Sequence, residues 1–95
     1  MIERHAASNG AVAVTFRLPA DHPAAPIGVA GEFNDWEWEA TPLSQVDDHL
    51  EATVTLRPGR YQFRYRTADD RWFNDERADD YVPNEFGGVN CIVEV

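Results

Sequence analysis

Apolar residues occupy every second position in several segments of this chain, and this period of two is the strongest constraint on its fold. Residues 11–18 read AVAVTFRL and residues 49–57 read HLEATVTLR, with apolar side chains at each even-numbered position. Successive side chains of a β-strand point to opposite faces of the sheet, so both segments are predicted to be strands with one buried face. Residues 61–67 (YQFRYRT) repeat the pattern, with aromatic side chains on the buried face and Arg64 on the outward face.

Shorter segments complete an all-β interpretation of the sequence. Strands are also predicted at residues 26–33, 71–73 and 89–95, whereas residues 74–88 are polar and are predicted to be irregular. Proline, glycine and β-branched residues interrupt every candidate helix. About seven short strands with turn residues every ~8–12 positions are typical of an antiparallel β-sandwich of the immunoglobulin type. Cys91 is the only cysteine, so this sandwich is expected to lack a disulfide.

The chain is predicted to form one domain. Its 95 residues suffice for a single modest hydrophobic core. We expect residues 1–10 to be a flexible N-terminal tail and residues 11–95 to form the domain. The N-terminal segment lacks the apolar core of a signal peptide, and no apolar run approaches the ~20 residues of a membrane span. A cytoplasmic location is therefore expected.

The charge of the chain excludes some classes of partner. The sequence has 17 acidic residues against 8 basic ones, all of them arginine, which gives a net charge of -9. Nucleic acids and anionic membrane surfaces are bound through concentrated positive charge. We therefore expect neither of them to be a partner.

The sequence offers no catalytic or metal-binding constellation. Its acidic pairs, at 47–48, 69–70 and 79–80, lie among turn residues, where we expect solvated side chains rather than an acid/base pair. The single cysteine and the scattered histidines do not match a zinc site, and no glycine-rich loop matches a phosphate site. We therefore expect neither an enzyme nor a bound metal or cofactor.

Aromatic residues near turns are the remaining candidates for function. The sequence has five Phe, three Tyr and three Trp, more than a small sandwich core readily buries. Those in or beside predicted turns include Trp36, Trp38, Trp72 and Phe86. An indole fixed at a rigid turn can stack on the C–H face of a sugar ring, but it can equally plug one end of a sandwich. The residue pattern alone leaves both interpretations open for Trp36 and Trp72.

The order of the motifs resembles that of a known family. GEFNDW, the turn and strand PGRYQFRY, RWFND and the closing YVPNEFGGVNCIVEV follow one another as in carbohydrate-binding module family 48. This family, also called isoamylase N-terminal or early-set domains, includes the glycogen-binding domain of the β subunit of AMP-activated protein kinase. The resemblance runs from about residue 12 to residue 95 and implies an early-set, immunoglobulin-like fold, which we expect here as a standalone domain.

The resemblance also implies a set of binding residues. In the kinase-type members, two tryptophans, a basic residue, an apolar loop residue and an asparagine hold the glucan. The matching positions in this sequence are Trp36, Trp72, Arg64, Phe86 and Asn90. Gly88 replaces a small hydroxyl residue of the family, and Trp38 has no counterpart in it, so these two positions are additional candidates.

The function implied by the resemblance is non-catalytic binding of an α-glucan such as glycogen, starch or a maltooligosaccharide. In enzyme relatives, catalysis belongs to a separate (α/β)₈ barrel, and because none follows Val95 we expect no glycoside hydrolase activity. The alternative is a protein-interaction module, or an accessory subunit of a glucan-active enzyme or kinase-like complex, that keeps the fold without binding sugar.

Overall fold

Nine β-strands make up about half of the residues that the structure describes. The structure is a computed structural model that describes residues 2–20 and 26–95. Within these residues three short 3-10 helices accompany the strands, and there is no α-helix, hence none long and apolar enough to cross a membrane. The strands are β1 (Ile2–Ala6), β2 (Val12–Pro19), β3 (Ile27–Gly31), β4 (Ser44–Val46), β5 (His49–Leu56), β6 (Arg60–Thr67), β7 (Trp72–Phe73), β8 (Asp80–Pro83) and β9 (Val89–Glu94). The 3-10 helices are η1 (Ser8–Gly10), η2 (Glu32–Asn34) and η3 (Trp38–Ala40).

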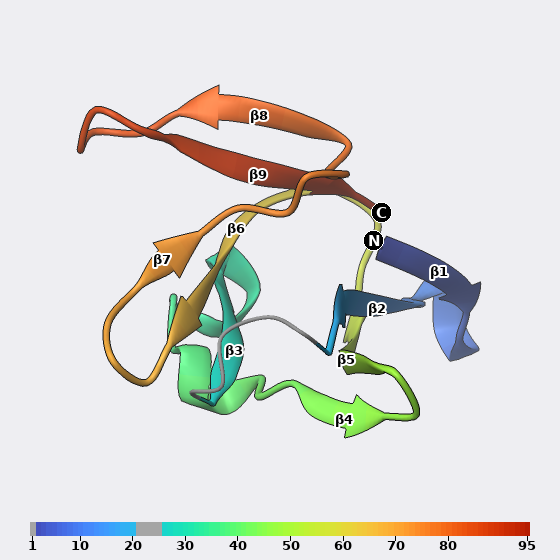
Figure 1. The fold of residues 1–95 in the computed structure, drawn as a ribbon. Coiled ribbons are helices and arrows are strands. Elements are labelled where there is room, and N and C mark those ends of the chain that lie inside the picture. The colour runs from blue at the N-terminus through green and yellow to red at the C-terminus, as the bar shows by residue number, and fades with distance from the viewer. Residues whose placement is uncertain (1, 21–25) are drawn as a thin grey trace.

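The strands form two antiparallel sheets (Figure 1). The first sheet has the order β1-β2-β5-β4, and the second has the order β3-β6-β9-β8, with β7 paired to β6. Strands β1 to β6 and β9 therefore follow the two-sheet order of a constant-type immunoglobulin domain, which confirms the predicted antiparallel β-sandwich. The remaining strands, β7 and β8, are short additions in the connection between β6 and β9.

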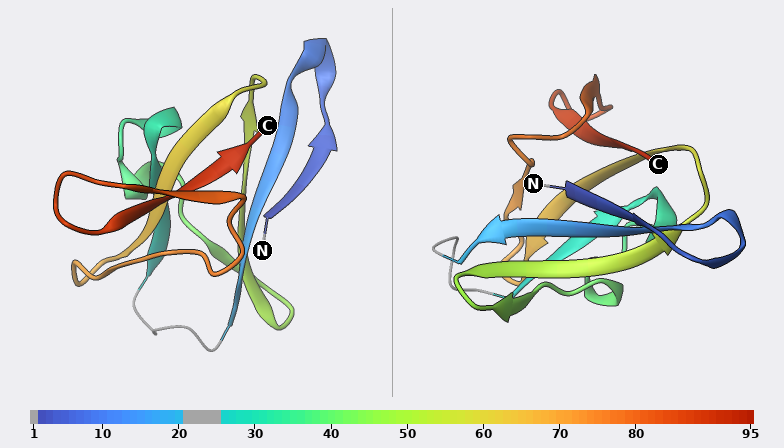
Figure 2. Two further views of the ribbon diagram at one scale, coloured as in Figure 1. Left: turned by 90° about the horizontal axis from the view of Figure 1, so that it is seen from above. Right: turned by 90° about the vertical axis from the view of Figure 1, so that its right-hand side faces the viewer.

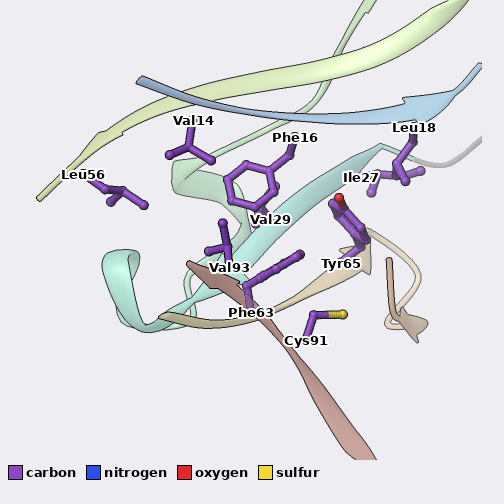
Figure 3. Packing of buried hydrophobic residues seen from close by; sticks show 10 residues of the cluster. All are labelled: Val14, Phe16, Leu18, Ile27, Val29, Leu56, Phe63, Tyr65, Cys91 and Val93. Carbon is purple, nitrogen blue, oxygen red and sulfur yellow. The ribbon is translucent and has the colours of Figure 1, made fainter. Parts of the chain in front are cut away.

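The hydrophobic core lies between the two sheets (Figure 3). Phe16 of β2 reaches the opposite sheet, where its ring packs edge-on against Phe63 at 4.9 Å between centroids. The Phe16 ring also stacks on Phe33 of η2 at 5.7 Å. The buried cluster comprises Val14, Phe16, Leu18, Ile27, Val29, Leu56, Phe63, Tyr65, Cys91 and Val93. Burying a large side chain of this kind contributes about 1.5–3 kcal/mol, so the apolar alternation determines which face of each strand turns inward.

One polar cluster is buried beside this core. The Tyr65 hydroxyl donates to Oδ2 of Asp75 at 2.7 Å, and Asp75 is only 2% exposed. Burial, reinforced by the Asp75 carboxylate, holds the pKa of Tyr65 well above its ordinary value. The Asp75 N–H donates to the sulfur of Cys91 at 3.2 Å, and burial raises the pKa of the Cys91 thiol to about 11. These contacts fix the segment after β7 against β6 and β9.

The N-terminal segment differs from the flexible tail predicted for residues 1–10. Ile2–Ala6 forms β1, which pairs with β2 along its whole length (Figure 2). Arg4 ties β1 to the second sheet, because its Nε donates to the Glu94 carbonyl at 2.7 Å and its guanidinium pairs with Asp79. Three of the five residues of β1 are exposed, so this strand carries no alternating apolar face that the sequence could reveal.

Strands β4 and β8 were also not predicted. Residues 74–88, expected to be irregular, contain β8, which pairs with β9 along Asp80–Pro83. All three residues of β4 and three of the four residues of β8 are exposed. Neither strand buries one face, so neither shows a period of two.

Candidate functional site

A groove lies on the outward face of the second sheet. Alternation along β6 turns Phe63 and Tyr65 into the core and leaves Gln62, Arg64 and Arg66 on the outer face. The groove has a volume of about 780 Å³. It is lined by Glu32, Trp36, Gln62, Arg64, Trp72, Pro83, Asn84, Glu85, Phe86 and Asn90.

The groove brings together the five binding residues that the family resemblance implied. They are Trp36, Arg64, Trp72, Phe86 and Asn90. The additional candidates, Trp38 and Gly88, are not among the lining residues. Sequence reasoning missed the other five lining residues, of which only Gln62 had a signal, since alternation places it on the same outward face as Arg64.

The turn before Trp36 is braced by the side chain of Asn34. The Asn34 amide nitrogen donates to the Val29 carbonyl at 2.8 Å and to the Thr41 hydroxyl at 3.0 Å. The Asn34 Oδ1 accepts the Gly31 N–H at 3.0 Å. Trp36 itself has a φ of 61°, a left-handed conformation that is uncommon for a bulky residue and costs about 1–3 kcal/mol. The braced turn therefore holds the indole in a position that the backbone would not favour by itself.

Neither Trp36 nor Trp72 is buried in the core. Trp36 is 36% exposed and Trp72 is 40% exposed, and both line the groove. Neither belongs to the buried hydrophobic cluster between the sheets. These positions do not fit the interpretation of Trp36 and Trp72 as plugs at the ends of the sandwich.

Arg64 is fixed beside Trp72. Its guanidinium carbon lies 6.0 Å from the centre of the Trp72 ring, at the outer limit of a cation–π contact. Its Nε donates to Oδ1 of Asn74 at 2.8 Å, and the Asn74 amide donates to the Val89 carbonyl at 3.1 Å. The ion pairs formed among the described residues do not include Arg64. Its guanidinium is therefore held beside the groove through the amide of Asn74 rather than through one of these ion pairs.

The loop between β8 and β9 presents Phe86. The Asn84 side-chain oxygen accepts the N–H of Phe86 at 2.9 Å and the N–H of Gly88 at 3.0 Å. Gly87 has a φ of 85°, a conformation that glycine adopts at no steric cost. The loop closed in this way leaves Phe86 87% exposed. Phe86 thereby adds exposed apolar surface to that of Trp36 and Trp72 in the groove, and a group of exposed apolar side chains is typical of a contact surface.

Amide side chains form a linked row in the groove. The Asn84 amide donates to Oδ1 of Asn90 at 3.1 Å, and the Asn90 amide donates to Oε1 of Gln62 at 2.9 Å. The backbone N–H of Gln62 donates to Oε1 of Glu32 at 2.7 Å. Each amide has two N–H donors and an oxygen with two lone pairs, so these bonds leave capacity for a ligand. The row can therefore offer both donors and acceptors.

The groove carries charges of both signs. Arg64 contributes a guanidinium group, and Glu32 and Glu85 contribute carboxylates. The chain as a whole has a net charge of -9, which repels polyanions. A neutral ligand with many hydroxyl groups can use the rings, the amides and the guanidinium together. The residues described by the structure contain no group of three or more side chains able to hold a metal ion.

The sequence matches the model of a known family. The family model described as the glycogen recognition site of AMP-activated protein kinase matches residues 12–95, which is most of the chain. No curated protein matches the sequence in a direct comparison.

Proposed function

Because the chain belongs to the family of glycogen recognition sites of AMP-activated protein kinase, we propose that it is a non-catalytic module that binds α-glucans in the groove. The observation that carries this proposal is the position of Trp36 and Trp72, two exposed indoles in one groove with Arg64 beside them. Sugars have apolar C–H faces and a polar rim of hydroxyl groups. Aromatic rings combined with a few fixed polar groups suit such a ligand.

Five of the lining residues have a defined part in the proposed complex. Trp36 and Trp72 stack on the C–H faces of glucose rings, and Phe86 adds a third apolar surface. Arg64 and Asn90 donate hydrogen bonds to hydroxyl groups. Shielding ~100 Å² of ring surface at ~25 cal/mol/Å² gives about 2.5 kcal/mol gross for each stacked ring. After the entropy cost of association, we expect a Kd between about 1 μM and 1 mM, equivalent to about 4–8 kcal/mol.

Two of the positions compared with the family depart from the pattern of the kinase-type members. Arg64 stands where lysine is common, and its planar guanidinium offers more donors in a fixed geometry. Gly88 stands in place of a small hydroxyl residue, and its N–H already donates to Asn84. Recognition of hydroxyl groups is therefore expected to depend chiefly on Arg64 and Asn90.

The carboxylates of the groove have no catalytic part in this proposal. Glu32 accepts the Gln62 N–H and so supports the wall of the groove, while Glu85 lies exposed in the β8–β9 loop. A glycosidase needs a pair of carboxyl groups on either side of the scissile bond, one of them kept protonated by its surroundings. We expect no reducing sugar to be released from glycogen during prolonged incubation, and sustained release would contradict the non-catalytic assignment.

Titration of the ¹⁵N-labelled protein with maltoheptaose tests the proposal. We expect saturable shifts at groove signals, including the Gln62 amide and the Trp72 indole N–H, and none at Thr53 on the opposite sheet. The β-linked cellohexaose serves as the ligand control. Val46→Ala serves as the protein control, because Val46 is an exposed apolar residue of β4, on the other sheet.

Several millimolar maltoheptaose should saturate a site of the expected affinity. If the groove signals do not move at that concentration, α-glucan binding is wrong and a protein-interaction role becomes the better assignment. Equal responses to maltoheptaose and cellohexaose would contradict selectivity for the α-linkage while leaving sugar binding in place.

A further inference from the structure

A second group of side chains continues the aromatic surface beyond the groove. The Arg66 guanidinium carbon lies 5.7 Å from the ring centre of Trp72 and 5.4 Å from that of Trp38. Arg66 therefore links an indole that lines the groove to one that does not. Trp38 is positioned by close backbone packing, because a Cβ added to Gly28 would lie 2.0 Å from the Trp38 carbonyl oxygen. Only glycine admits η3 at this distance from β3.

Arg66 also pairs with a carboxylate at the surface. Its Nε lies 3.2 Å from Oδ1 of Asp70, whose side chain is 73% exposed. Asp70 has a φ of 67°, a conformation that Asp and Asn adopt more readily than most other residues. The pair places guanidinium N–H donors beside carboxylate acceptors. This combination matches neighbouring hydroxyl groups on the edge of a sugar ring, each of which both donates and accepts.

Stability gives no sufficient reason for this arrangement. An exposed ion pair adds little to the free energy of unfolding, and Trp72 remains substantially in water although it contacts Arg66. Aromatic surface and fixed polar groups are thus combined a second time, on the side of Trp72 that carries Arg66 and Trp38. The same combination in the groove is the basis of the proposed function.

We propose that Trp38, Arg66 and Asp70 form a second sugar subsite, joined to the groove through Trp72, that takes up further residues of a longer α-glucan. This inference rests on the proposed function, because it extends the same binding surface. A short oligosaccharide fills the groove, and only a chain long enough to pass Trp72 reaches the second subsite. The module then binds long glucan chains more tightly than short ones.

Calorimetric titration with maltotriose and maltoheptaose tests this inference. Asp70→Asn keeps a residue suited to the turn but removes the carboxylate, and Arg66→Gln removes the guanidinium. Each substitution should weaken maltoheptaose binding about 2- to 10-fold, the effect of one hydrogen bond, and leave maltotriose binding unchanged. Arg71→Gln is the matched control, because Arg71 lies in the same turn but pairs with Asp69 at 3.1 Å. Circular dichroism of each variant checks that the fold is intact.

Each result separates this inference from the proposed function. A loss confined to maltoheptaose supports the second subsite. Equal losses for both sugars would show that Arg66 only positions Trp72, and unchanged affinities would show that these side chains do not touch the ligand. Either result overturns the second subsite while α-glucan binding itself stands. If the unaltered protein binds neither sugar, the proposed function fails and the second subsite fails with it.

Discussion

Replacing Asn34 with alanine should lower the free energy of unfolding by about 2–4 kcal/mol. The Asn34 side chain makes three hydrogen bonds, with Gly31, Val29 and Thr41, at 2.8–3.0 Å. Alanine cannot replace these bonds, and all three partners are buried, so each lost bond costs at least the ~0.5–1.5 kcal/mol of a typical hydrogen bond. The turn that carries the strained φ of 61° at Trp36 then loses the three bonds that brace it. The loss is a large part of the ~5–15 kcal/mol that stabilises a typical domain.

Urea unfolding followed by circular dichroism measures this loss directly. In a domain of this size, Tm should also fall by about 8 °C or more, since about 1 kcal/mol shifts Tm by ~4–8 °C. Gln45→Ala is the control, because the exposed Gln45 amide donates to the Asp47 carbonyl at 3.3 Å and its loss should cost less than about 0.5 kcal/mol. If Asn34→Ala costs no more than this control, Asn34 does not brace the turn, and the explanation of the Trp36 position is refuted.

Two further predictions concern titrating groups. Hydrogen bonds from Arg17 lower the pKa of Glu51 below its ordinary value of 4.5, so the pair adds stability above that pH and loses it as the pH falls. Arg17→Gln should therefore lower the free energy of unfolding at about pH 7 and change it less at about pH 3. An equal effect at the two pH values would contradict the link between the Glu51 pKa and stability. Cys91 is fully buried and burial raises its pKa to about 11, so at about pH 8 a thiol reagent should label it only as fast as the protein unfolds. Rapid labelling under native conditions would contradict that burial.

The sequence predicts the strands that turn buried side chains into the core. β2 and β5 each pair with two strands and β6 pairs with three, and all of them turn one face into the core, so burial selects an apolar residue at every second position. β1, β4 and β8 lie at sheet edges and are mostly exposed. Backbone hydrogen bonds to one neighbour hold them in place and put little constraint on their side chains. For this reason they are absent from the prediction, and β1 falls within the segment expected to be a tail.

In the groove, the sequence predicts the candidate binding residues but not the residues whose hydrogen bonds fix them in position. Motif positions identify Trp36 and Arg64 because they lie in segments with a recognisable order. The similar segments EFND and WFND each contain an asparagine that serves as a brace, Asn34 for the Trp36 turn and Asn74 for Arg64. The amide of Asn74 bonds to Val89, 15 residues further along the chain. Such a contact exists only once the sheets have formed, so no local pattern predicts it.

The dissociation constant of maltoheptaose for the Trp36→Ala and Trp72→Ala variants tests the central claim most directly. Both indoles are partly exposed, so both variants should fold, which their unfolding curves in urea can establish. We predict that each substitution weakens binding about tenfold or more, because each removes a stacked ring worth more than the ~1.4 kcal/mol of a tenfold change. Val46→Ala, on the opposite sheet, should bind as the unaltered protein does. Folded tryptophan variants that bind maltoheptaose with unchanged affinity would contradict the claim that this groove is an α-glucan site.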